Sequence, residues 1–316
     1  MQKSRIRAHI RNNTFYNDHN DAHESLLRSG WSFVKSLYNR SARKPQNLAE
    51  WVHSQPVVHA THTPVITWIG HATFLIQMNG INIITDPIFG GASFLFPRML
   101  PPGITVEKLP NIDYILLSHN HPDHFDAHSL RLLIEKNPGA KILVPLGDKR
   151  WFDKRGYTQA QEFDWWQNIT ANNITFTFCP AHHWSRRGIL DTNKSLWGSW
   201  MISGSVHVYF AGDTAYGRHF NQIQEEFGVI HAALMPIGPC EPDDHMRRTH
   251  VDAAQAGQAF LELEATHFIP MHWGTFAFGK DSFLDPVNRI KRWWELHVAH
   301  EHKKLHILPV GKRLEL

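Results

Sequence analysis

Four side chains that could bind a transition metal lie within six residues of this sequence. Residues 119–124 contain His119, His121, Asp123 and His124. Imidazole and carboxylate groups are ligands that zinc and similar borderline metals accept. The spacing therefore predicts a metal site, although a solvated polar loop in which Asp123 caps a following helix would have the same sequence.

Further candidate ligands follow other strand-like segments. They are His182 and His183 after residues 174–179, Asp213 after residues 206–211, and His272 after residues 267–271. Residues 119–124 likewise follow a continuous apolar run at 113–118. Ligands at the ends of neighbouring strands are held by rigid elements, as a preorganised metal site requires. We expect these strand ends to meet at one centre.

The predicted elements favour an α/β fold. Strands are expected at residues 65–68, 73–77, 81–85, 113–118, 141–144, 174–179, 199–202, 206–211, 233–235, 267–271 and 305–308, and helices near Leu130 and at 220–227, 251–263 and 282–297. Asn79-Gly80 predicts a tight hairpin between the second and third strands. Hairpins followed by alternating strands and helices predict two mixed β-sheets covered by helices, in a four-layer α/β/β/α sandwich.

The first part of the sequence differs from the rest. Residues 1–62 mix charges and asparagines, and the apolar residues between Trp31 and Leu37 predict one short amphipathic helix. The β-rich pattern begins at Val65. We therefore divide the chain into an N-terminal extension, residues 1–62, that packs on the core, and a main domain, residues 63–316.

The composition is that of an ordinary globular protein, with 42% hydrophobic and 19% charged residues among 316. A formal net charge of +3 is too small to indicate a nucleic-acid partner. The two cysteines, Cys179 and Cys240, are too few for a disulfide framework and fit a reducing compartment. The first 13 residues lack the apolar stretch of a secretory signal. We expect a cytoplasmic protein, at most peripherally attached to a membrane.

Seven short motifs, in their order and spacing, resemble the metallo-β-lactamase superfamily. Within it, the sequence is most similar to the branch that contains N-acyl-phosphatidylethanolamine-hydrolysing phospholipase D and its bacterial relatives. The motifs are residues 68–73, 85–89, 119–124, 180–184, 197–200, 210–214 and 271–276. The resemblance implies that residues 63–316 form a hydrolase domain with a dinuclear metal centre.

The resemblance also implies which side chains bind the two ions. They are His119, His121 and His183 for one ion, Asp123, His124 and His272 for the other, and Asp213 as a bridge between them. Asp123 and Asp213 are predicted to serve catalysis as well, since Asp123 can orient the attacking water while it binds metal. Zinc suits such ligands, and manganese or iron could substitute.

Other residues have more open assignments. The family pattern has one histidine before its tryptophan, so we expect His183, which directly precedes Trp184, to be the ligand and His182 to lie beside the site. His71 and Asp86 are predicted to orient ligands, or else to be a core histidine and a turn residue. His250 is predicted to contact the substrate, with a helix-start position as the alternative.

The leading functional hypothesis is a phosphodiesterase of phospholipase D type that acts on an N-acyl phospholipid or a similar lipid phosphodiester. A lactone or other cyclic ester hydrolase with the same centre, and a non-catalytic metal-binding protein, are the alternatives. The expected partner is a small-molecule or lipid substrate, and no nucleic acid is expected. A peripheral membrane contact and a homodimer are left open. The apolar loop at residues 89–103 could line an acyl groove, face a membrane or pack as core.

Overall fold

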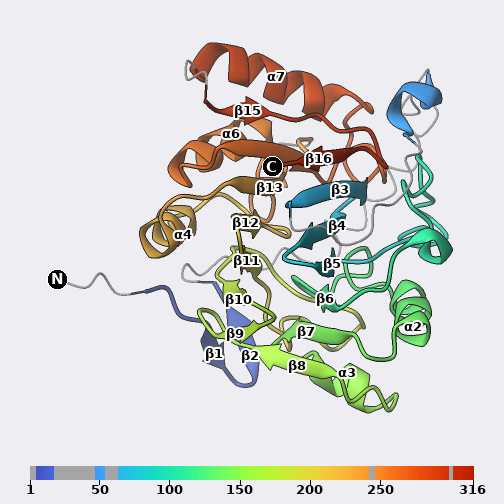
Figure 1. The fold of residues 1–316 in the computed structure, drawn as a ribbon. Coiled ribbons are helices and arrows are strands. Elements are labelled where there is room, and N and C mark those ends of the chain that lie inside the picture. Colours follow the sequence, from blue (N-terminus) through green and yellow to red (C-terminus); the bar gives the residue numbers. More distant parts are fainter. Residues whose placement is uncertain (1–4, 18–46, 54–62, 242–245, 299–301) are drawn as a thin grey trace.

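The computed structural model of the protein describes residues 5–17, 47–53, 63–241, 246–298 and 302–316. Two seven-stranded β-sheets lie face to face, and helices cover their outer faces (Figure 1). The predicted α/β/β/α sandwich of two mixed sheets is confirmed. The amphipathic helix predicted around Trp31 lies outside the described residues.

One sheet contains the strand that leads into residues 119–124. Its order is β16 (Arg313–Glu315), β3 (Val65–Gly70), β4 (Thr73–Met78), β5 (Ile81–Thr85), β6 (Tyr114–Leu116), β7 (Lys141–Pro145) and β8 (Ala160–Phe163). Pairing is antiparallel from β16 to β5 and parallel from β5 to β8. The connections contain η3 (Val106–Lys108), α2 (Ala127–Lys136) and α3 (Lys149–Asp153). Asn79 and Gly80 both have positive φ, as the predicted hairpin turn between β4 and β5 requires.

The second sheet repeats this arrangement. Its order is β9 (Asn168–Ala171), β10 (Ile174–Cys179), β11 (Ser199–Ser203), β12 (His207–Phe210), β13 (Ala232–Pro236), β14 (His267–Met271) and β15 (Lys304–Leu305). Pairing is antiparallel from β9 to β12 and parallel from β12 to β15. The helices α4 (His219–Phe227), α6 (Ala253–Glu262) and α7 (Asp285–His297) connect the parallel strands.

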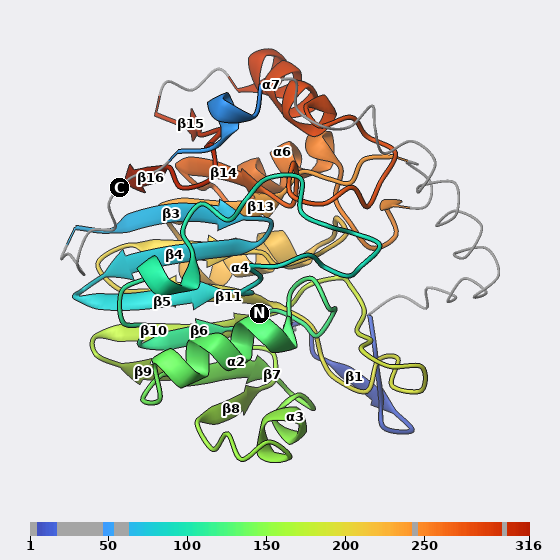
Figure 2. The ribbon, with the colours of Figure 1, turned by 90° about the vertical axis from the view of Figure 1, so that its right-hand side faces the viewer.

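Strand direction decides where the candidate ligands meet. Two antiparallel pairings separate β10 from β12, and two parallel pairings separate β12 from β14, so all three strands end at the same edge. In the first sheet β3, β5 and β6 share one direction for the same reason. The loops that follow these strands project from the right-hand end of the sandwich in Figure 2.

The two sheets are joined directly beside the 119–124 segment. The Trp200 Nε1 donates to the carbonyl of Leu117 at 2.9 Å, and the Gly198 N–H donates to the carbonyl of Ser118 at 2.9 Å. Gly212 has a φ of +59°, and a Cβ there would lie 2.5 Å from the Ser118 Cβ. Glycine is therefore required for the second sheet to approach the start of the metal-ligand loop this closely.

The differences from the predicted elements have local causes. The carboxylate of Asp126, not that of Asp123, caps α2 by accepting from the Ser129 N–H at 2.9 Å. Helix α6 begins at Ala253 instead of residue 251 because Asp252 and Gln255 form a capping box. The edge strands β8, β9 and β16 were not predicted, since each is short and mixes polar with apolar residues.

The described parts of residues 1–62 pack against the sandwich. Ile6 and Phe15, the latter in the hairpin of β1 (His9–Arg11) and β2 (Thr14–Tyr16), are buried. Trp51, at the end of η2 (Leu48–Trp51), meets the ring of Trp273 edge to face at 5.3 Å. The division into an extension and a hydrolase domain at residue 62 stays a prediction. Among the described residues, no helix is long and apolar enough to cross a bilayer.

We expect Gly212→Ala to lower the free energy of unfolding more than Gly156→Ala does. Both glycines have positive φ, but a Cβ at Gly156 meets nothing within 4 Å, whereas one at Gly212 overlaps Ser118. The control should cost about 1 kcal/mol for backbone strain, and overlap should add about 1–3 kcal/mol at Gly212. Urea unfolding of both variants measures the difference. Equal losses would show that the sheets have room to separate here.

Candidate metal centre

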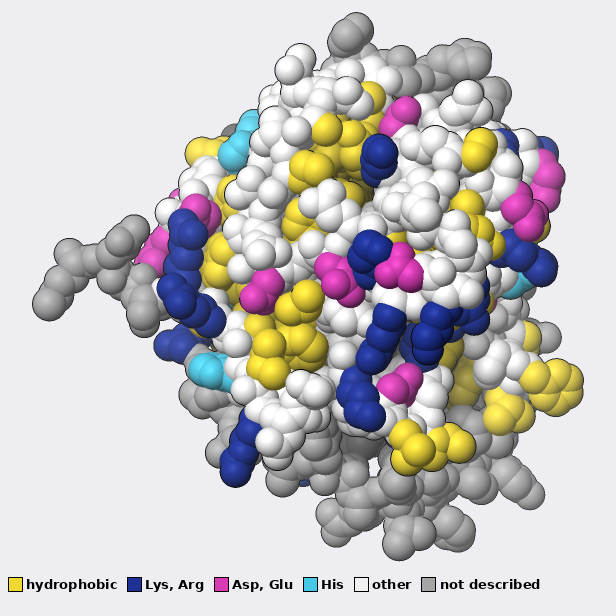
Figure 3. Space-filling view, turned by 90° about the horizontal axis from the view of Figure 1, so that it is seen from below, with side chains coloured by type: hydrophobic (Ala, Val, Ile, Leu, Met, Phe, Trp, Pro, Cys, Tyr) yellow, Lys and Arg dark blue, Asp and Glu magenta, His cyan; other side chains and the backbone are white. Residues whose placement is uncertain are grey.

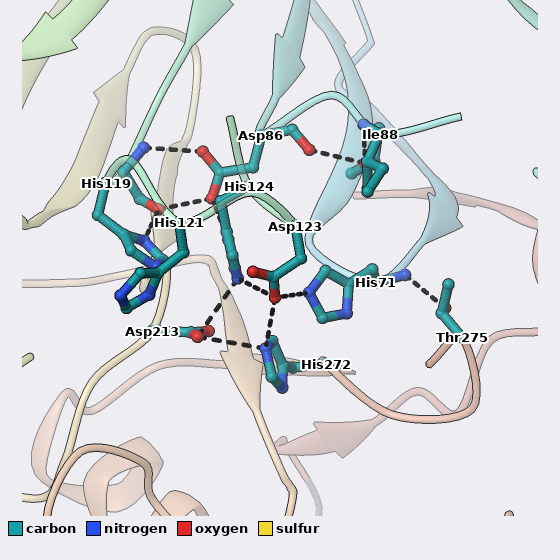
Figure 4. A network of polar contacts seen from close by, with 12 residues as sticks. His71, Asp86, Ile88, His119, His121, Asp123, His124, Asp213, His272 and Thr275 are labelled. Carbon is teal, nitrogen blue, oxygen red and sulfur yellow. Dashed lines mark hydrogen bonds and ion pairs between the residues drawn. The ribbon is translucent and has the colours of Figure 1, made fainter. Parts of the chain in front are cut away.

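The structure brings the seven predicted ligands together at the edge where the strands end. Figure 4 labels six of them, all except His183. Among the described residues, potential ligand atoms within 4.8 Å of one another form one group at His119, His121 and His183 and another at His71, Asp123, His124 and His272. Asp213 joins a group with His183 and His250. All of these side chains are buried or largely buried.

Three imidazole nitrogens converge in the first group. The Nδ1 of His121 lies 2.8 Å from the Nε2 of His119 and 3.2 Å from the Nε2 of His183. The His183 Nδ1 must carry a proton because it donates to the carbonyl of Thr249 at 2.7 Å. A neutral His183 therefore presents a lone pair at Nε2, toward the other two histidines.

The second group is oriented in the same way. His272 donates from Nδ1 to the carbonyl of Gly238 at 2.8 Å, and His124 donates from Nδ1 to the Asp86 carboxylate at 2.7 Å. The Nε2 atoms of both histidines consequently face inward. That of His124 lies 3.4 Å and that of His272 3.9 Å from the Oδ2 of Asp123.

Asp213 lies between the two groups. Its Oδ2 is 3.2 Å from the Nε2 of His272 and 3.3 Å from that of His124, and 3.8 Å from the Nε2 of His183. One carboxylate oxygen is thus within reach of ligands from both groups. This is the position expected of a bridging ligand.

Several inward-facing atoms are buried without a hydrogen-bond partner among the described residues. They include the Nε2 atoms of His124 and His272 and the Oδ1 of Asp213. Nitrogen lone pairs and carboxylate oxygens repel one another when they face each other away from water. Buried polar groups in proteins ordinarily have a hydrogen-bond or ion-pair partner. Cations at this position would satisfy them, so the His and Asp clusters fit a dinuclear metal site.

The electrostatics of the metal-free site support this reading. Burial alone would raise the pKa of Asp123 and Asp213, but the imidazoles, His124 foremost, hold both well below the ordinary range. Burial would lower the pKa of His124, yet the two carboxylates raise it well above its usual value. Burial lowers the pKa of His121 to about 4 and that of His183 to about 3. A proton on His124 therefore supplies positive charge that metal ions would replace.

His71 and Asp86 form hydrogen bonds to two of the predicted ligands, Asp123 and His124. Burial, with the neighbouring His272, lowers the pKa of His71 to about 3, so its neutral ring donates from Nε2 to the Oδ2 of Asp123 at 2.9 Å. Asp86 accepts from the Ser118 N–H at 2.7 Å as well as from His124. Both residues contact predicted ligands. That they orient these ligands toward metal stays a prediction.

The geometry distinguishes His183 from His182. His183 lies in the first ligand group, whereas His182 is in none of the candidate groups of the described residues, and its backbone N–H donates to the Oγ1 of Thr214 at 3.0 Å. His250, just ahead of α6, faces the centre with its Nδ1 3.6 Å from the Oδ2 of Asp213. Burial lowers the pKa of His250 to about 3.

A second set of polar residues contacts the 119–124 loop on the side away from the metal ligands. The sequence did not predict this set. Asn120 donates to the buried carboxylate of Asp148 at 2.9 Å, while Arg187 donates to the carbonyls of Asn120 and Phe125. Asn120 stands between two predicted ligands in the sequence, and this position was the one sequence signal for its role. Asp148 lies 28 positions away from Asn120, so nothing in the local sequence pointed to it.

Two other parts of the chain have plain outcomes. Cys240 is buried, and burial raises the pKa of its thiol to about 12. The apolar loop at 89–103 is divided: Leu100 is buried, Phe96 packs on Phe278 with ring centroids 4.9 Å apart, and Phe94 is 98% exposed.

Comparison with known proteins gives consistent results. The model of a β-lactamase superfamily domain matches residues 81–273. The chain is 34% identical over 255 residues to N-acyl-phosphatidylethanolamine-hydrolyzing phospholipase D 1 of Caenorhabditis elegans, across 75% of this chain and 71% of that protein. It is 36% identical over 239 residues to the mitochondrial N-acyl-phosphatidylethanolamine-hydrolyzing phospholipase D of Saccharomyces cerevisiae. That alignment covers 71% of this chain and only 50% of the yeast protein.

The solved structure of Igni18, a metallo hydrolase from Ignicoccus hospitalis, superposes with a TM-score of 0.62. The superposition covers 80% of this chain and 98% of that one, at 22% sequence identity. At this identity the likeness concerns the fold alone.

We expect purified protein to contain about two equivalents of divalent transition metal per chain. His183→Ala should lose metal because it removes an inward-facing lone pair, while His182→Ala should keep the wild-type content. Elemental mass spectrometry after reconstitution measures both. Equal metal loss in the two variants, or no metal uptake by the wild type, would contradict the assigned site.

The metal-free protein should lose stability as the pH falls. His71, His121, His183 and His250 have folded pKa values of about 3, 4, 3 and 3. The unfolded chain, with histidine pKa values of about 6.5, therefore takes up more protons below that pH, and each such histidine costs about 1.4 kcal/mol between about pH 7.5 and 5.5. The raised pKa of His124 opposes this trend but is one group, whereas burial lowers the pKa of these four histidines and also of His119, His219 and His306. Urea unfolding after chelation at the two pH values measures the loss, and unchanged stability would contradict the buried neutral histidines.

Proposed function

Since the chain belongs to the metallo-β-lactamase superfamily and has the His and Asp site of its metal-dependent hydrolases, we propose that it is a phosphodiesterase of phospholipase D type. Its substrate is an N-acyl phospholipid or a similar lipid phosphodiester. The observation that carries the proposal is the placement of Asp213 Oδ2 between two converging ligand groups. The named activity of the relatives supports the choice of substrate.

Two divalent cations at this centre, zinc by the ligand types with manganese or iron as alternatives, would polarise a phosphoryl oxygen and lower the pKa of water. Asp123 supplies a carboxylate that stays ionised over the physiological pH range, because the neighbouring imidazoles outweigh the effect of burial on its pKa. The hydrogen bond from His71 fixes one oxygen of this carboxylate. Asp123 is therefore placed to orient the attacking water.

His250 is suited to bind the substrate. Its side chain is 16% exposed, and its Nδ1 has no hydrogen-bond partner among the described residues. The ring is neutral because its pKa is about 3. A neutral imidazole can donate one hydrogen bond to a phosphoryl oxygen, where negative charge increases during displacement.

An apolar wall beside the metal centre favours a substrate with an acyl chain. A small cavity next to His272 is lined by Met99, Phe276, Phe278 and Phe283 among others. The ring centroid of Phe278 lies 6.2 Å from that of His272. Each methylene buried against such a surface contributes about 0.8 kcal/mol, so binding energy increases with chain length.

A parallel assay of the metal-loaded protein tests this function. N-acyl phospholipids and aryl phosphodiesters should be hydrolysed, with the oxygen of water recovered on phosphorus, and acyl lactones and β-lactams should react slowly or not at all. Fast lactone hydrolysis with inert phosphodiesters would favour the cyclic-ester alternative. Inactivity on all four classes would favour a metal-binding protein without catalysis.

Asp123→Asn should reduce phosphodiester turnover about 100-fold or more while the fold persists, because it removes a charged ligand and the group that orients water. Asp153→Asn, on the exposed end of α3, is the matched control and should retain full turnover. Metal content and unfolding curves are measured on both. A folded, metal-loaded Asp123→Asn protein with wild-type turnover would remove Asp123 from the mechanism.

A further inference from the structure

The loop between His183 and β11 holds two aliphatic side chains in solvent. Ile189 is 93% exposed and Leu190 is 84% exposed. The backbone around them is fixed, because the Asp191 carboxylate accepts from the Arg187 N–H at 3.2 Å and from the Gly188 N–H at 2.8 Å. Two adjacent aliphatic side chains at the tip of an ordered loop bury little apolar surface when the chain folds. Exposure of this kind marks an interaction site.

The same loop is attached to the metal centre. At its start, the ring of Trp184 lies 4.4 Å from that of the predicted ligand His121. Arg187 donates to the carbonyl of Phe125 and lies over the Phe125 ring at 4.3 Å. Phe125 directly follows the predicted ligand His124. A surface that binds the tip would consequently lie at a fixed position relative to the metal centre.

Positive charge surrounds the base of this loop. Arg150, Lys154 and Arg155, in and just after α3, are exposed, as is Lys194 in the loop itself. Arg150 reaches the carbonyl of Lys194 at 3.4 Å, which joins α3 to the loop. Figure 3 shows Lys and Arg side chains gathered on this lower face with hydrophobic side chains beside them. Apolar tips flanked by cations suit an anionic bilayer surface.

We propose that the tip formed by Ile189 and Leu190 docks the protein on an anionic lipid bilayer, so that a lipid phosphodiester enters the metal centre directly from the membrane. The inference rests on the proposed lipid phosphodiesterase function. The loop at residues 89–100, whose Phe94 is 98% exposed, projects from the same end of the sandwich in Figure 2 and gives the surface a second apolar contact.

Vesicle co-sedimentation tests the docking surface. Metal-loaded wild-type protein is mixed with phosphatidylcholine vesicles that contain or lack phosphatidylglycerol, and it should partition more strongly onto the anionic vesicles. Replacing both tip residues, Ile189→Ser with Leu190→Ser, should weaken this partition about tenfold, or about 1.4 kcal/mol. The controls Val229→Ser and Leu296→Ser, at positions 65% and 70% exposed elsewhere on the surface, should bind like the wild type.

Charge is tested separately from the apolar tip. Lys154→Gln with Lys194→Gln should abolish most of the preference for phosphatidylglycerol and leave binding to neutral vesicles unchanged. Wild-type partition of the tip variant, or the absence of wild-type binding to either vesicle, would overturn the proposal. Equal losses of vesicle binding in the tip variant and the Val229→Ser control would indicate nonspecific hydrophobic adsorption and would also overturn the proposal.

Turnover separates failure of docking from failure of the proposed function. The tip variant should hydrolyse a short-chain, water-soluble phosphodiester at the wild-type rate and the same headgroup in vesicles at least about tenfold more slowly. Equal loss on both substrates would place the tip in the fold or the site and would contradict docking. If the wild type binds vesicles through the tip but hydrolyses neither substrate, docking stands and the phosphodiesterase function fails.

Discussion

Electrostatic repulsion among buried ligand atoms is the constraint on which this structure depends. Asp123 and Asp213 face ring nitrogens of five buried or largely buried histidines, where there is little water to screen them. Such an arrangement is stable only with positive charge among the groups. In the metal-free protein a proton on His124 provides part of it, and the unpartnered atoms at His272 and Asp213 show that the proton alone does not satisfy the site.

The surrounding sandwich keeps these groups from moving apart. Hydrogen bonds donated to Asp86, Thr249 and Gly238 set the ring orientation of three ligands, so that a change of ring orientation would break buried hydrogen bonds. Gly212 lets the two sheets approach closely at Ser118. The contacts that hold the ligands in place are thus distributed over both sheets. This coupling of fold and metal site is typical of preorganised centres.

The centre and its surroundings have different chemical roles. Family membership and ligand geometry specify a metal-dependent hydrolase, which can act on phosphoryl or carbonyl groups. Under the proposed function, selectivity is assigned to groups outside the ligands: His250, the aromatic wall near Phe278 and the exposed tip of Ile189 and Leu190. These groups share an apolar or neutral character beside a charged centre.

The sequence alone determined the ligand types and the strands that carry them, because hydrophobic runs and polar strand ends are local patterns. It therefore predicted the sandwich, the 119–124 loop and the ligand-bearing ends of β10, β12 and β14. The family pattern favoured His183 over His182, but only the tertiary structure shows which of the two side chains lies among the candidate ligands, since adjacent residues differ in direction. The tertiary structure also revealed Asp148 and Arg187, whose partners lie 28 and 62 positions away along the chain. Contacts at such separations depend on how the sheets pack, and packing is a property of the whole chain that no local pattern contains.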